Sequence, residues 1–315
     1  MFAPLVFWYY VAISVSLANP SRHTSDMSAG RVVLSLAVVL TATLALSGQS
    51  ILAKLEGLLQ LSGAPVAASS AQLSEHELEE INAMQAQDQV MRLLERTINH
   101  YSGASQEIEK RGDGWLGQIH STPELTKLTD VAYFSSDLRV RAAALEIWRI
   151  EAGFHKTREA VDEIINAAAT TADRKYFYLS HLGILGNRGV ERQKVFDTLQ
   201  LYAHDPDGDT RAAAINGLAL LGTENTIAPL LEIFHSDSSH DLRERAACNL
   251  ADSGMLPREL RKTAVPELIR FSRDPNLDQT TKKWVYQALR EITLQTIGDD
   301  PSAWLSWHGA QAAQR

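Results

Sequence analysis

The sequence predicts an all-α fold, an α-solenoid of about five stacked helical hairpins preceded by a long N-terminal helix. The chain of 315 residues is rich in Leu and Ala and contains only 7 % aromatic residues, which favours helices over strands. Apolar residues recur with the spacing of one helix face, and the pattern returns about every 35 residues. Gly and Asp residues separate the helical stretches at regular places.

The first helix of each repeat has apolar or small residues at offsets 0, 3, 4 and 7. These series begin at positions 145, 179, 215, 247 and 285, which are 34, 36, 32 and 38 residues apart. A second series lies between them and begins at positions 161, 195, 227 and 265. Because a single hairpin cannot bury its apolar face alone, successive hairpins are expected to stack. We place this solenoid at residues 122–308.

Glycine and aspartate residues mark the expected helix ends. The second helices should end at Asp-containing turns, namely Asp205-Pro206, Asp237-Ser238 and Asp274-Pro275. Arg149 interrupts the apolar series of the first repeat, which makes that repeat the least regular. The glycines predicted to end the first helices in a left-handed conformation are Gly153, Gly186, Gly222 and Gly254.

An N-terminal helical segment is predicted at residues 74–121. Ser74 is a candidate N-cap with Glu77 as its capping-box partner, and a single helix should continue to about residue 101. The tripeptide Arg111-Gly112-Asp113 matches a cell-adhesion motif, but three residues in a Gly-rich stretch more often form a turn. Thr122 and Pro123 are typical of the start of the next helix.

The N-terminus predicts export or membrane anchoring. An uncharged apolar stretch at 32–47 follows Arg31, with small residues suited to cleavage before Gly48. We therefore expect a signal peptide or membrane anchor at 27–47, with Met27 as the initiator and 1–26 as an extension from an over-long gene prediction. Residues 48–73 have the composition of a linker. The expected location is the periplasm or cell envelope, secreted or tethered to the membrane.

Composition argues against several functions. The net charge of −8 is opposite to the positive surface that nucleic-acid binding requires. The single cysteine, Cys248, excludes internal disulfides and cysteine-rich metal sites, and its apolar context predicts a small buried side chain.

Candidate chemical motifs are weak. Asp205, Asp207 and Asp209 resemble the start of a calcium loop, but Asn216 stands where the closing Glu is required. We expect instead an Asp-Pro turn in which Asp209 caps the next helix. His235 and His240 share one turn but lack a third ligand. Nucleophile-elbow, Walker and dinucleotide-binding motifs are absent from the sequence. We predict no catalytic, cofactor-binding or metal-binding residues, and the binding residues are unknown.

The repeats resemble a known family. The stretches at 209–222 and 241–254 are similar to first helices of HEAT repeats, and those at 227–234 and 264–271 to second helices. The end of the chain, 288–307, is similar to the end of bacterial HEAT-repeat proteins, including those with bilin-lyase-like repeats. The resemblance covers about 135–308 and implies the fold, whereas HEAT arrays serve many partners. His76-Glu77 is the only His-Glu pair, which argues against the iron-binding HEAT enzymes.

These observations predict a scaffold without catalytic activity. Its concave face, lined by the second helices, should bind a protein or peptide. A lyase or chaperone acting on a chromophore or small ligand is the alternative. Trp304 and Trp307 are expected to seal the last hairpin, although an exposed pair could instead be a contact point for a partner.

Overall fold

The computed structural model describes residues 71–313, and the structural features below all lie in this range. The predictions for 1–26, 27–47 and most of the 48–73 linker lie outside it. The described residues belong to one compact unit, Ser70–Arg315, and their regular structure is helical apart from a single bridge between Gln72 and Ser102. The solenoid prediction is confirmed, with the differences given below.

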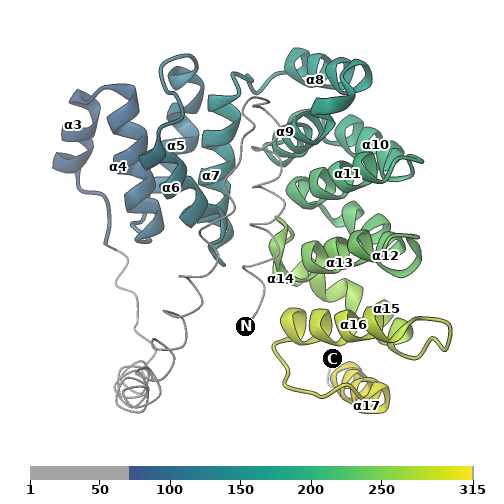
Figure 1. Cartoon of the computed structure of the whole chain (residues 1–315). Coiled ribbons are helices and arrows are strands. Elements are labelled where there is room, and N and C mark those ends of the chain that lie inside the picture. The colour runs from purple at the N-terminus through teal and green to yellow at the C-terminus, as the bar shows by residue number, and fades with distance from the viewer. Residues whose placement is uncertain (1–70, 314–315) are drawn as a thin grey trace, which may run out of the picture. The chain divides into compact units, whose positions relative to one another are not determined.

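An N-terminal module precedes the repeats (blue to teal in Figure 1). Its core contains Leu73, Trp115 and Ile150 among other buried apolar residues. Ala71 and Leu73 pair with Ser102 through backbone hydrogen bonds, so the last residues of the predicted linker belong to the folded module. Its elements are α3 (Glu75–Ala83), α4 (Ala86–Ile98), α5 (Ala104–Arg111), the short 3-10 helix η1 (Gly112–Trp115), α6 (Pro123–Tyr133) and α7 (Leu138–Glu151).

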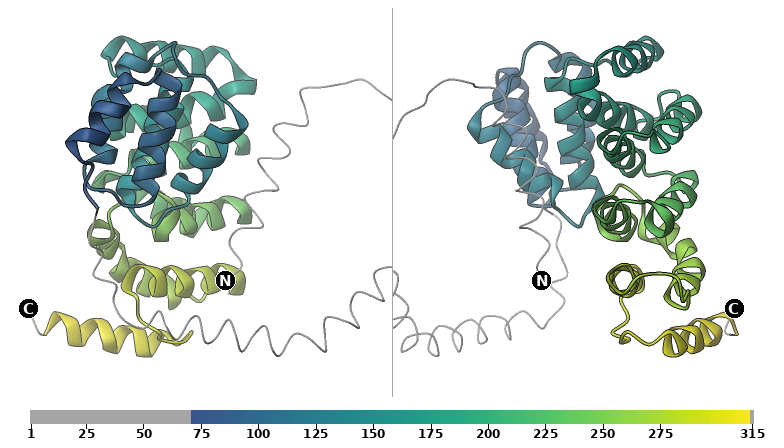
Figure 2. Two further views of the ribbon diagram at one scale, coloured as in Figure 1. Left: turned by 90° about the vertical axis from the view of Figure 1, so that its left-hand side faces the viewer. Right: turned by 45° about the vertical axis from the view of Figure 1, so that its right-hand side comes forward.

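The repeat array follows from α8 to α17, coloured teal to yellow (Figure 1, Figure 2). Consecutive first helices, such as α9 and α11, pack against each other. The second helices α8, α10, α12 and α15 pack against first helices, whereas α17 packs against α15. The first helices are α9 (Lys175–Asn187), α11 (Gly208–Leu221), α13 (His240–Cys248) and α16 (Gln279–Thr293). The second helices are α8 (Arg158–Thr170), α10 (Arg192–Ala203), α12 (Ile227–Ser236), α15 (Val265–Ser272) and α17 (Pro301–Ala312), and the single turn α14 (Arg258–Arg261) precedes α15.

The stretch predicted as one long N-terminal helix is divided into α3 and α4. The backbone is extended at Met84 and Gln85, where the sequence has neither Gly nor Pro. The break allows Met84 to pack against the module core, and the amide of Gln89 donates 2.9 Å to the Met84 carbonyl that the break leaves free. Ser74 caps α3 by accepting from the Glu77 amide, as predicted, but the Glu77 carboxylate binds Arg96 instead of closing a capping box.

Two of the four predicted glycine caps are confirmed. Gly153 and Gly222 have φ of +79° and +61°, the left-handed conformation that glycine adopts without strain. Gly186 lies inside α9, and Gly189 supplies the left-handed residue with φ of +91°. Gly254 is extended. Both exceptions are contact positions, since a Cβ on Gly186 would overlap Leu221 and Val195, and one on Gly254 would lie 3.1 Å from the Ala219 carbonyl.

The helix predicted to open the first repeat, α7, packs chiefly within the N-terminal module. It contacts α4, α5 and α6, and five of its apolar residues belong to the module core, namely Val140, Ala143, Ala144, Ile147 and Ile150. Its opposite side carries Leu145, which joins Ile184, Leu220 and Met255 in a separate small core. The helix α7 therefore lies between the module and the first helices of the array.

Candidate functional site

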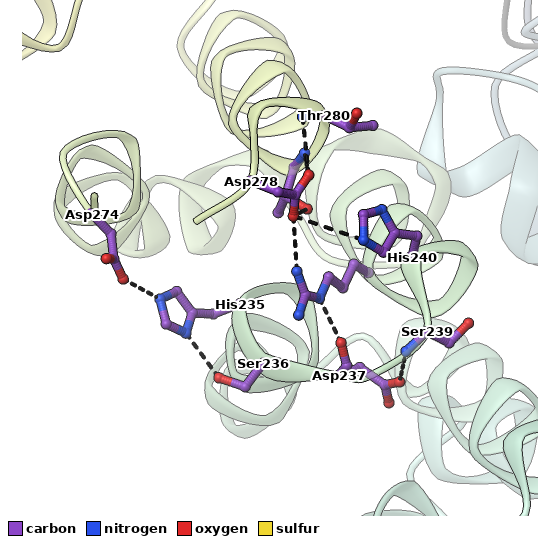
Figure 3. A network of polar contacts seen from close by, with 10 residues as sticks. His235, Ser236, Asp237, Ser239, His240, Asp274, Asp278 and Thr280 are labelled. Carbon is purple, nitrogen blue, oxygen red and sulfur yellow. Dashed lines mark hydrogen bonds and ion pairs between the residues drawn. The ribbon is translucent and has the colours of Figure 1, made fainter. Parts of the chain in front are cut away.

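Polar residues at the turns between repeats form the first candidate site. Asp237 accepts from Arg211 at 2.9 Å, and Asp278 accepts from Arg243 at 3.0 Å, so each contact joins one repeat to the next. Figure 3 shows the part of this network around Asp237 and Asp278. The Asp278 carboxylate also caps α16, and the hydrogen bond from Thr281 holds its pKa below the ordinary value. We define these contacts as the turn ladder.

His235 and His240 lie next to the turn ladder, against different partners. His235 Nε2 is 2.9 Å from the Asp274 carboxylate and its Nδ1 is 2.8 Å from the Ser236 hydroxyl (Figure 3). His240 Nε2 is 4.0 Å from Asp278. Within residues 71–313, no group of three His, Cys, Asp or Glu side chains could hold a metal ion.

The three aspartates that resemble a calcium loop have separate structural contacts. Asp205 accepts from the Asp207 amide at 2.9 Å, which forms the turn. Asp207 caps α11 by accepting from the Thr210 amide at 2.8 Å and from its hydroxyl at 2.6 Å. The prediction that Asp209 is the cap is therefore wrong by two residues. Hydrogen bonds from Thr210 lower the pKa of Asp207, as expected for a capping carboxylate.

A buried charge cluster explains why Arg149 interrupts the apolar pattern. Arg149 and Glu146 are both 0 % exposed, and Arg149 Nη2 lies 2.7 Å from Glu146 Oε1. The same Glu146 oxygen accepts from Lys156 at 3.1 Å, and its other oxygen lies 3.0 Å from Arg188 Nε. Arg149 also pairs with Asp113 at 2.8 Å. The cluster therefore joins η1, α7 and the end of α9.

The charge of Glu146 is compensated by its neighbours. Burial alone would raise its pKa, but the hydrogen bond from Arg149 and the charges of Arg188 and Lys156 hold the pKa below the ordinary value. The three ionisable groups that contact the Glu146 carboxylate are all cationic, namely Arg149, Lys156 and Arg188. Such an arrangement keeps the carboxylate ionised and has a structural role. The cluster stabilises the seam between module and array; it offers no uncharged acid or base for catalysis.

Arg141 makes the second polar contact across this seam. Its side chain is 4 % exposed, and its guanidinium donates to the carbonyls of Asp252 at 2.8 Å and Ser135 at 2.7 Å. A further bond goes to the Gly254 carbonyl. Asp252 lies in the π-helical turn η4 (Asn249–Ser253), where the backbone departs from α-helical bonding. Arg141 therefore binds carbonyls that the irregular end of α13 leaves available.

The tripeptide Arg111-Gly112-Asp113 is used structurally. Arg111 donates to Glu107 at 2.9 Å and to Gln89 at 3.2 Å. Gly112 is buried against Glu146, where a Cβ would lie only 2.5 Å from the carboxylate oxygen. Because Asp113 pairs with Arg149, the three residues connect α5 to the buried charge cluster, and this packing agrees with the prediction of a structural turn.

The two tryptophans near the end of the chain, Trp304 and Trp307, differ in how far they are buried. Trp304 is 0 % exposed within the array core, and its indole N–H donates to the Gly298 carbonyl at 2.9 Å. Trp307 is partly buried and lies edge-on to it, with 5.7 Å between ring centroids. The burial of Trp304 supports the predicted seal of the last hairpin.

Cys248 is partly buried, and burial raises the pKa of its thiol to about 11, which disfavours a reactive thiolate.

The second helices present an exposed row of side chains. The sixth residue of each of four successive second helices is exposed, and these residues form what we call the second-helix ridge. The residue three positions after each ridge residue lies about one turn further on, and after α15, which ends at Ser272, this residue is the C-cap. The ridge residues are Glu163, Asp197, Glu232 and Arg270, and the residues three positions further on are Asn166, Gln200, His235 and Arg273. The sequence periodicity contained this signal, because residues at equal places in the repeat must share one face.

Two grooves accompany these surfaces. The larger, about 480 Å³, lies beside the last second helices, and we call it the α15–α17 groove. The other, about 410 Å³, lies in the N-terminal module near Trp115, where Gln89 accepts from both Trp115 and Arg111. The α15–α17 groove is lined by Pro266, Ile269, Arg270, Arg273, Asp274, Pro275 and Leu305.

The comparison with protein families agrees with the repeat architecture. The family model described as HEAT repeats matches residues 161–251. No curated protein matches the chain. The chain is similar to the crystal structure of an engineered protein of the Northeast Structural Genomics Consortium, with 14 % identity over 67 % of this chain and 98 % of that one. The TM-score of this pair is 0.33. Between residues 71 and 313, no helix combines the length and apolar character needed to cross a membrane.

Proposed function

We propose, from the premise that residues 161–251 are HEAT repeats, that this chain is a non-catalytic scaffold that binds a protein or peptide on its second-helix face. HEAT repeats commonly serve as protein-interaction scaffolds. The observation that carries the choice of face is the position of α7. Its Leu145 packs on Ile184, Leu220 and Met255, so the module already covers part of the first-helix face.

The second-helix face supports the proposal by its exposure. The second helices α10 and α12 have their main contacts with first helices, and the ridge residues Glu163, Asp197 and Glu232 are exposed. A row of side chains at regular intervals along a stack of helices is suited to an extended partner. Charged ridge residues give such a surface specificity and fast association more than affinity.

The test is crosslinking capture in native cells followed by mass spectrometry. The full-length chain is compared with a triple variant of the ridge, Glu163→Lys, Asp197→Lys and Glu232→Lys. A matched control reverses three exposed carboxylates of α3, Glu75→Lys, Glu79→Lys and Glu80→Lys, and so changes the net charge equally. We expect one reproducible partner that the ridge variant loses and the α3 variant keeps. A partner kept equally by both variants would refute the second-helix face.

We also propose that residues 27–47 direct export or anchor the chain in the cell envelope. The support is the uncharged apolar stretch after Arg31. N-terminal sequencing of the native protein tests this: cleavage predicts Gly48 as the first residue, and an anchor predicts an intact segment in the membrane fraction. An intact residue 1 on a protein found outside the envelope would contradict both.

The lyase or chaperone alternative stays a prediction, and native mass spectrometry for a co-purifying chromophore would test it.

A further inference from the structure

The outer face of α15 differs from those of the other second helices in its charge. At the ridge position, α8, α10 and α12 carry Glu163, Asp197 and Glu232, whereas α15 carries Arg270. Three positions further on, the first three second helices carry Asn166, Gln200 and His235, whereas Arg273 follows directly after the end of α15. At the ridge position the charge therefore changes from acidic in α8, α10 and α12 to basic in α15.

Arg270 of α15 and Arg273, the residue after the end of that helix, lie beside a groove with an apolar wall. Ile269 is 3 % exposed and forms part of the wall, whereas Leu305 of α17 remains 46 % exposed beside it. Figure 1 shows α17 following α15 and α16 at the end of the array. Trp304 takes the buried position of α17, so Leu305, the next residue, points away from the core. An exposed leucine next to a groove is the kind of apolar surface that binds a partner.

The charges that line the groove favour an anion. Asp274 is the one carboxylate among the lining residues, and it is already engaged by His235 at 2.9 Å and by the Asn276 amide at 2.8 Å. Arg270 donates to Glu267 from Nε at 3.0 Å and from Nη2 at 2.6 Å, and its side chain is 59 % exposed, so its Nη1 can donate to a further acceptor. Among residues 71–313, Arg273 makes no ion pair. The guanidinium groups of Arg270 and Arg273 therefore face solvent beside an apolar wall. The one carboxylate in the lining, Asp274, is bound by His235 and Asn276.

We propose that the α15–α17 groove is the docking site for an acidic peptide segment of the partner, with an aliphatic side chain between its carboxylates. The aliphatic side chain packs on Leu305 and Ile269, and the flanking carboxylates pair with Arg273 and Arg270. The guanidinium of Arg273 suits this contact because it can bind a carboxylate in a bidentate manner, whereas Arg270, already bidentate with Glu267, contributes its Nη1 donor. A volume of about 480 Å³ accommodates a few residues of peptide. This inference rests on the proposed function and assigns one part of the second-helix face to the peptide.

The experiment measures fluorescence anisotropy of a fluorescein-labelled peptide of repeated Glu-Asp-Leu units with the full-length chain. A peptide of repeated Lys-Lys-Leu units is the control for charge. We expect saturable binding of the acidic peptide, weakened at high salt because the contact is ionic. Arg273→Glu should weaken it by at least about tenfold, whereas Arg273→Lys, which keeps the charge but loses the bidentate geometry, should weaken it less. Leu305→Ser should weaken it a few-fold by removing apolar contact area.

Lys283→Glu is the matched control, because Lys283 is exposed on α16 and the substitution changes the net charge as Arg273→Glu does. Circular dichroism verifies that each variant is folded. Equal loss in the Lys283 and Arg273 variants, or no saturable binding, would overturn the proposal. Binding that instead tracks self-association in analytical ultracentrifugation would assign the groove to a second copy and also overturn it. If the peptide fails while capture in cells still depends on the acidic ridge, the scaffold function stands and only the groove assignment falls.

Discussion

The array and the seam between array and N-terminal module bring helices together by different means. Within the array, α9 and α11 approach through glycine, since a Cβ on Gly183 would overlap the backbone of Gly217. At the seam, α7 instead contributes large charged side chains, and Arg141, Glu146 and Arg149 are all buried. Close backbone packing tolerates no added atom, whereas a buried charge tolerates no lost partner. The two regions should therefore fail under opposite kinds of substitution.

The largest effect is expected at the seam. Glu146→Ala removes the one carboxylate that compensates Arg188 and Lys156, and it takes a partner from Arg149. Leaving buried cations without their counter-charge costs about 3–5 kcal/mol of unfolding free energy, measured by urea denaturation. The control is Asp162→Ala, whose pair with Lys194 is exposed at 44 % and 48 %, and whose loss should cost under about 1 kcal/mol. Equal losses in both variants would mean that the cluster does not hold the seam.

The end of the array should respond to a large-to-small substitution. Trp304→Ala removes a fully buried side chain from the array core and leaves a cavity, so we expect a loss of about 3 kcal/mol. Trp307→Ala should cost less, because that ring is only partly buried. Thermal unfolding followed by circular dichroism separates the two. Unchanged melting of both variants together with lost partner binding would favour a binding role for the pair.

The array should also respond to a single added methyl group. Gly183→Ala places a Cβ against the Gly217 backbone, which must move, and overpacking of this kind costs about 1–3 kcal/mol. Gly309→Ala in α17 is the control, since a Cβ there meets nothing within 4 Å and alanine has the higher helix propensity. Denaturation should show opposite signs, a loss for the first variant and a gain of up to about 1 kcal/mol for the second. A gain for both would contradict close packing of α9 on α11.

The smallest effect concerns acid. Hydrogen bonding to Thr281 lowers the pKa of Asp278 from its ordinary value of 3.8, so the ionised carboxylate stabilises the folded protein above about pH 4. This stability is lost as the pH falls through the lowered pKa of the folded state. Asp278→Asn keeps an N-cap but has no charge to lose, so its unfolding free energy should fall less between pH 5 and pH 2 than that of the unmodified chain. Parallel pH profiles would show that the turn ladder adds no pH-dependent stability.

Periodic features of the sequence were predictable, and contacts between distant residues were not. The spacing of apolar residues predicts the repeats because it reflects one helix face, and the Asp-containing turns end α10, α12 and α15 as expected. Gly186 and Gly254 could not be told from helix caps, since a glycine required for close packing has the same residue type as one required for a left-handed turn. The break at Met84 was equally hidden, because tertiary packing produces it without a local breaker.

The candidate sites divide in the same way. Local chemistry sufficed to reject the calcium loop and the Arg111-Gly112-Asp113 motif, and the structure assigns those residues to caps, turns and ion pairs. The charge change along the second helices was present in the sequence at equal repeat positions. The groove beside α15 was not, because it depends on how Leu305 of α17 is left exposed next to Arg273.

The sequence by itself determined the helical class, the hairpin repeat and most helix ends, because these depend on residues within one turn or one repeat of each other. Only the tertiary structure decided that α7 belongs to the N-terminal module and lies over the first helices. That position depends on Arg141 and Glu146 meeting backbone carbonyls and charges more than 40 residues away along the chain. Such pairings have no periodicity, and a buried charge is stable only where the folded chain supplies its partner.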